Sequence, residues 1–135
     1  MSKPIELMRE CNQILMRLHD VNKQQLVYLR QGEFNKLDIF TDKRQAILEM
    51  LDIVEEQLDR RLNELTEDEK PAMSREISLR KEVLQSILNQ EMDLHKLVEQ
   101  EKSKTILELQ GSKKHRKAVS AYKSGVGKNK DLKEV

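Results

Sequence analysis

The stretch LMRECNQILMRLHDV, residues 7–21, contains a regular helical pattern of apolar residues. Its apolar positions lie three or four residues apart: Leu7, Cys11, Ile14, Leu18 and Val21. This spacing is typical of an amphipathic helix that buries one face against a partner. Pro4 suits the first turn of such a helix, where its missing N–H is not needed. The sequence therefore predicts a helix over residues 4–31.

Two further apolar stripes of the same period follow, over residues 33–65 and 72–110, and Gly32 and Pro71 mark the breaks. The first of these stripes contains Phe34, Leu37, Ile47, Leu48, Leu51, Val54, Leu58, Leu62 and Leu65. The second contains Ile77, Leu84, Ile87, Leu88, Leu94, Leu97, Val98, Ile106 and Leu109. Because short connections make neighbouring helices antiparallel, the sequence predicts an all-α fold, an elongated antiparallel three-helix bundle.

The composition supports this fold class and excludes several others. Of 135 residues, 36% are charged, 37% are hydrophobic and 3% are aromatic, which favours long helices over a thick α/β core or a β-sandwich. The chain has one cysteine, no apolar stretch long enough to span a membrane and no signal-peptide pattern at its start. We therefore expect a cytoplasmic protein with no stable membrane insertion.

A polar layer is predicted inside the first helical hairpin. When the first two helices are paired antiparallel about Gly32, Asn22 and Gln25 come near Thr41 and Arg44. The apolar stripes of both helices thin out at this level. The layer is interpreted as a hydrogen-bonded set that fixes the register of the helices, with a ligand pocket as the alternative.

The C-terminal tail differs in charge from the rest of the chain. Residues 111–135 contain eight basic and two acidic residues, a net charge of +6, which leaves −5 on the predicted bundle domain, residues 1–110. Within the tail, we predict a short helix at residues 113–123 and disorder from residue 125 onward. In that helix, Ala118, Val119 and Tyr122 would share one face.

Catalytic and metal-binding patterns are missing from the sequence. His19, His95 and His115 have no paired spacing, and Cys11 lies on an apolar stripe without an activating base. The sequence GVGK at residues 125–128 lacks the first glycine and the final hydroxyl residue of a phosphate-binding loop. We therefore expect no enzyme activity, no metal site and no cofactor.

Three stretches resemble the small cytoplasmic chaperones of flagellar type III export, the FliT and FlgN group. They are LRQGEFNKL at residues 29–37, TDKRQAIL at residues 41–48 and KKHRKAVSAYK at residues 113–123. The resemblance implies a chaperone that binds a late flagellar export substrate, a hook-associated or cap protein, and delivers it to the export gate. It also implies that Tyr122 docks on the cytoplasmic domain of the export-gate protein.

The resemblance, combined with the helical spacing, implies the binding residues. Export-gate docking is assigned to Tyr122, Val119 and Ala118, with electrostatic steering by Lys113, Lys114, Arg116, Lys117 and Lys123. Client binding is assigned to the third apolar stripe, at Leu84, Ile87, Leu94, Val98, Ile106 and Leu109.

Two alternative functions and the oligomeric state stay open. One alternative is a coiled-coil adaptor or tether, against which the breaks at Gly32 and Pro71 count. The other is a nucleic-acid or membrane-surface module that binds through the basic tail, although the acidic bundle leads us to expect no nucleic acid. The oligomeric state stays open between a monomer and a homodimer.

Overall fold

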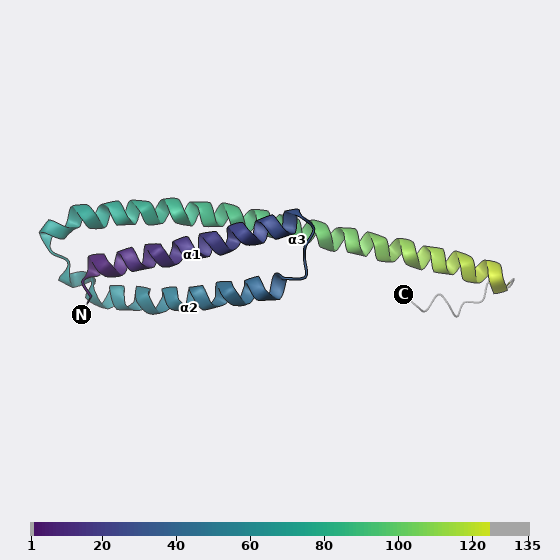
Figure 1. The fold of residues 1–135 in the computed structure, drawn as a ribbon, viewed down its shortest axis with the longest axis horizontal. Coiled ribbons are helices and arrows are strands. Elements are labelled where there is room, and N and C mark those ends of the chain that lie inside the picture. Colours follow the sequence, from purple (N-terminus) through teal and green to yellow (C-terminus); the bar gives the residue numbers. More distant parts are fainter. Residues whose placement is uncertain (1, 125–135) are drawn as a thin grey trace. The chain divides into compact units, whose positions relative to one another are not determined.

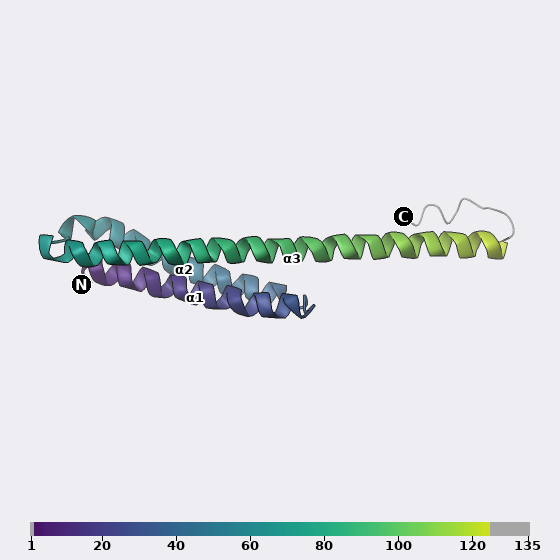
Figure 2. The ribbon, with the colours of Figure 1, turned by 90° about the horizontal axis from the view of Figure 1, so that it is seen from above.

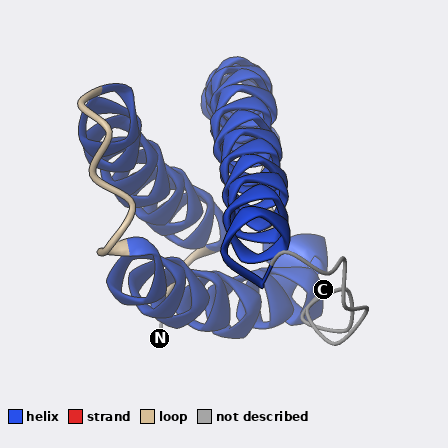
Figure 3. Ribbon diagram, turned by 90° about the vertical axis from the view of Figure 1, so that its right-hand side faces the viewer, coloured by secondary structure: helices blue, strands red, loops and turns tan. Residues whose placement is uncertain are grey.

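Three α-helices make up most of the structure, which is a computed structural model. The structure describes residues 2–124, without the side chains of residues 115 and 118–124. The helices are α1 (Pro4–Arg30), α2 (Leu37–Arg61) and α3 (Lys70–Ser124), and two 3₁₀ turns, η1 (Leu62–Glu64) and η2 (Glu67–Glu69), link the last two. Figure 3 shows helices and loops but no strand over these residues. The helices pack antiparallel, which confirms the predicted all-α three-helix bundle (Figures 1 and 2).

The hydrophobic core is built from the apolar faces of all three helices. Its buried residues are Ile5, Leu7, Met8, Cys11, Ile14, Leu15, Leu18, Leu51, Val54, Leu58, Met73, Val83 and Ile87. The stripe of α1 contributes most of them, as its spacing predicts. Ile47, Leu65 and Ala72 are partly buried against this cluster. Burial of one face of each helix therefore holds the three together.

Gly32 ends α1 as predicted. Its φ of 81° lies in the left-handed region that favours glycine, and its N–H donates to the carbonyl of Leu29 over 3.0 Å. The N–H of Glu33 donates to the carbonyl of Tyr28 over 2.9 Å. This closed turn takes up residues that the sequence predicts to be helical from 33 onward, so α2 begins only at Leu37.

The third helix differs from its prediction at both ends. It begins at Lys70, because Pro71 lies in the first turn, where a proline is tolerated. It does not end at Gln110: it runs through Gly111 and includes residues 113–123, which form no separate helix. One glycine in a helix interior costs about 1 kcal/mol, and the surrounding Leu, Glu and Lys residues favour the helix. The predicted disorder from residue 125 lies outside the described residues.

The chain divides into two compact units, residues 1–96 and 97–135. The first unit contains α1, α2 and the beginning of α3, with all the core residues named above. In the second unit, the described residues continue α3, and Ile106, Leu107 and Leu109 expose their side chains. No helix within residues 2–124 is long and apolar enough to cross a membrane.

The thiol of Cys11 is expected to be unreactive while the protein is folded. The residue is fully buried, and burial raises the pKa of its thiol above the ordinary value, which keeps it protonated. We therefore expect Ellman's reagent to react only at the rate of unfolding, and to react at once in urea. Rapid reaction in native buffer would contradict this burial.

The raised pKa of Cys11 also predicts a pH dependence of stability. Because the pKa of the thiol is raised in the folded protein, the thiol of the unfolded chain ionises at a lower pH than that of the folded protein. The free energy of unfolding therefore keeps its full value below the ordinary pKa of the thiol and falls as the pH rises above it. A Cys11→Ala variant should not show this loss in urea titrations at increasing pH.

Candidate partner-binding surface

The six residues predicted to bind a client differ in exposure. Ile87 and Leu94 are buried, and Val98 is half-buried. Leu84 is exposed in the first unit, whereas Ile106 and Leu109 are exposed in the second. Ile87 belongs to the hydrophobic core, so it stabilises the bundle and is not available to a partner.

The predicted docking residues lie in α3. The side chains of Ala118, Val119, Tyr122 and Lys123 are outside the described part of the chain. Of the other steering residues, Lys114 and Arg116 are exposed, and Lys113 and Lys117 are half-buried. The docking role of Tyr122 therefore stays a prediction.

Five of the exposed apolar side chains of α2, η1 and α3 share a flank of their helices, whereas others, such as Ile53 and Met92, lie elsewhere. On α3, Ile77, Leu84 and Leu88 are seven and four positions apart, which places them on one face of the helix. Leu48 of α2 and Leu62 of η1 are fourteen positions apart, about four helical turns, and share a face in the same way. The exposed fractions of these five side chains range from 36% to 55%. We call Leu48, Leu62, Ile77, Leu84 and Leu88 the apolar strip.

An ion pair joins the two halves of the apolar strip. Arg80 of α3 pairs with Glu55 of α2, and both side chains are about one-third exposed or less. Arg80 lies between Ile77 and Leu84 in the sequence, and Glu55 lies midway between the two leucines of the α2 half. Because the helices are antiparallel, Leu62 lies towards Ile77, and Leu48 towards Leu84 and Leu88. The strip is therefore a two-helix surface with a polar pair at its centre.

The predicted polar layer is present in part, since neither polar side-chain atom of Asn22 forms a hydrogen bond with a described residue. Asn22 and Gln25 are buried, and an Arg44 guanidinium N–H donates to the side-chain oxygen of Gln25. Burial lowers the pKa of Arg44, and the nearby Glu91 carboxylate opposes this shift. Thr41 is not a member: it is exposed, and its hydroxyl donates to the Leu37 carbonyl over 2.9 Å.

The third helix completes this layer, which the sequence does not predict. The amide of Gln90 donates to the backbone carbonyl of His19 over 3.0 Å, and the His19 Nε2 lies 2.8 Å from the hydroxyl of Ser86. Both contacts bring residues of α3 to α1. The sequence does not predict these contacts, because a single buried glutamine within a charged helix gives no periodic signal. The layer therefore fixes α3 in register with the hairpin.

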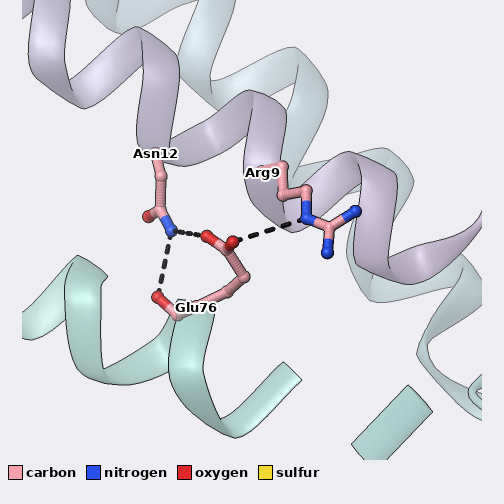
Figure 4. A network of polar contacts seen from close by, with 3 residues as sticks. All are labelled: Arg9, Asn12 and Glu76. Carbon is pink, nitrogen blue, oxygen red and sulfur yellow. Dashed lines mark hydrogen bonds and ion pairs between the residues drawn. The ribbon is translucent and has the colours of Figure 1, made fainter. Parts of the chain in front are cut away.

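A second polar network secures the beginning of α3 on α1 (Figure 4). The Asn12 amide nitrogen donates to both the backbone carbonyl of Glu76, over 3.0 Å, and its carboxylate, over 2.8 Å. The Arg9 Nε donates to the same carboxylate over 3.4 Å. Because Glu76 directly precedes Ile77, this network holds the α3 half of the apolar strip in place.

Other kinds of site are not supported by the described residues. A surface hollow of about 390 Å³ lies beside α1, away from both the strip and the polar layer. Its lining is mainly charged: Glu6, Arg9, Glu10, Gln13, Ile14, Arg17 and Met50. Over residues 2–124, no group of three or more His, Cys, Asp or Glu side chains could hold a metal ion. Comparison of the chain with protein-family models, curated proteins and solved structures finds no match.

Proposed function

We propose that this chain is a binding protein that holds an amphipathic helix of a partner protein on the apolar strip. One observation carries the proposal: five large apolar side chains are exposed together on neighbouring helices. Single exposed leucines are normal on a protein surface, whereas a contiguous apolar patch marks an interaction site. The spacing of the strip along two antiparallel helices suits a third helix laid over it, with contacts at i, i+3, i+4 and i+7.

The nature of the partner rests on the resemblance to flagellar export chaperones. We propose that the client is the terminal helix of a hook-associated or cap protein, bound in the cytoplasm before export. The tail around Tyr122 then docks on the export-gate protein. The chain performs no catalysis of its own and requires no cofactor.

Replacing Leu88 of the strip with aspartate is expected to weaken partner binding at least about tenfold, because burying one leucine contributes about 1.5–3 kcal/mol. The probe is a synthetic amphipathic peptide of about three heptads with leucine at positions a and d, measured by calorimetry. A purified hook-associated protein serves as the second ligand.

Ile53→Asp is the matched control for this experiment. Ile53 is 58% exposed, close to the 55% of Leu88, but it lies nine residues from Leu62, on the opposite side of its helix. Ile53→Asp and Tyr122→Ala should leave peptide binding unchanged. Equal binding by Leu88→Asp and wild type would contradict the proposal. Salt-sensitive binding to anionic vesicles or DNA, without peptide binding, would favour the surface-module alternative.

A further inference from the structure

The two edges of the apolar strip carry opposite charges. On α2, Asp52 lies four positions after Leu48, and Asp59 lies three positions before Leu62. Both are exposed and form no ion pair with a described residue. Because residues three and four apart are neighbours on a helix, these carboxylates border the strip. We call Asp52 and Asp59 the acidic edge.

The edge on α3 is basic. Lys81 lies between Ile77 and Leu84, four positions after the first and three before the second, and Lys70 lies two turns before Ile77. Both lysines are exposed; Lys70 pairs with Glu67 over 2.7 Å, and Lys81 forms no ion pair with a described residue. We call Lys70 and Lys81 the basic edge. A helix lying on the strip would therefore meet carboxylates along one side and ammonium groups along the other.

We propose that the partner helix carries basic residues along one edge of its apolar face and acidic residues along the other, and that these edges fix the direction in which it docks. The inference rests on the proposed function, since it concerns the same surface. Reversing a helix on the strip exchanges its two edges, so only one direction gives favourable pairs on both sides. The apolar contacts themselves are nearly the same in either direction.

The handedness of the α-helix predicts which direction is favoured. Seen from its N-terminus, an α-helix turns clockwise as the residue number rises. In this view of α3, the positions that contact α2 come first in the clockwise direction, and the strip follows them. A partner helix parallel to α3 therefore turns its e positions towards α2 and its g positions towards α3. A partner with lysine at e and glutamate at g should run parallel to α3, with its N-terminus near Leu62 and Ile77. The charge-exchanged partner should run the opposite way, with its N-terminus near Leu48 and Leu88.

The test uses two synthetic peptides with leucine at a and d, one with Lys at e and Glu at g and the other with these charges exchanged. Each carries a nitroxide at its N-terminus, and line broadening of the protein's amide signals reports where that end lies. The Lys-e peptide should broaden Leu62 and Ile77, and its charge-exchanged isomer Leu48 and Leu88. Because exposed ion pairs are individually weak, the preference should be about tenfold in low salt and should shrink in high salt.

A charge-reversed protein supplies the second arm. The variant Asp52→Lys, Asp59→Lys and Lys81→Glu should exchange the docking directions of the two peptides. The same charge changes on α1, Glu10→Lys, Asp20→Lys and Lys23→Glu, should leave the directions unchanged. Binding of both peptides in one direction, or without any preference, overturns the inference and leaves the proposed function intact. Binding of neither peptide, or dimerisation of the protein through the strip that excludes them, overturns both.

Discussion

Replacing Leu15 with alanine is expected to lower the free energy of unfolding by about 2–5 kcal/mol. Leu15 is 1% exposed and belongs to the core where α1 meets its neighbours. Truncation removes buried apolar contacts and leaves a cavity, because the well-packed surroundings relax only partly. Urea unfolding followed by far-UV circular dichroism measures the change, with the slope of the transition unchanged.

Val27→Ala on the same helix is the control for Leu15→Ala. The Val27 side chain is about half exposed, so its truncation should change the free energy of unfolding by no more than about 0.5 kcal/mol. Equal effects of the two substitutions would show that the face of α1 that carries Leu15 is not the buried one. A spectrum with substantial strand content would contradict the whole bundle.

The helices could be predicted from the sequence because the signals that define them are local. The spacing of apolar residues in α1 and the glycine after it fix one buried face and one end. Gly111 was misleading for a physical reason: a glycine ends a helix only where the chain can use a positive φ to turn, as Gly32 does. At Gly111 nothing requires a turn, and the helix continues.

The apolar strip could not be predicted in the same way, because it depends on which flank of α3 the other helices cover. Leu84 lies three positions before Ile87 and Leu88 one position after it, and all three belong to the same apolar stripe of the sequence. Only the antiparallel register, visible in the Arg80–Glu55 pair, shows that Ile87 is buried while its neighbours are exposed. Val83, which the sequence does not assign to the core, is buried for the same reason.

Asn22→Leu is expected to raise the free energy of unfolding by about 1–3 kcal/mol. Asn22 is fully buried at the polar layer, and neither its amide nitrogen nor its amide oxygen forms a hydrogen bond with a described residue. Folding therefore removes both polar atoms from water without replacing their hydrogen bonds, which is costly. Leucine has the same branched shape, so it removes the polar atoms with little change in how the side chain fits. Urea unfolding measures the gain.

Asn12→Leu, the same substitution at another position of α1, is the control for Asn22→Leu and should change the free energy of unfolding in the opposite direction. The Asn12 amide donates to Glu76 twice, so leucine there removes two hydrogen bonds and should lower the free energy of unfolding by about 1–3 kcal/mol. The pair of variants separates polarity from size, because the change in shape is identical. If Asn22→Leu instead destabilises the protein as Asn12→Leu does, Asn22 is hydrogen-bonded through buried water. If Asn22→Leu stabilises the protein but broadens the amide signals of α2 and α3, the helices no longer keep a single register. Asn22 then lowers the free energy of unfolding and at the same time fixes the register of these helices.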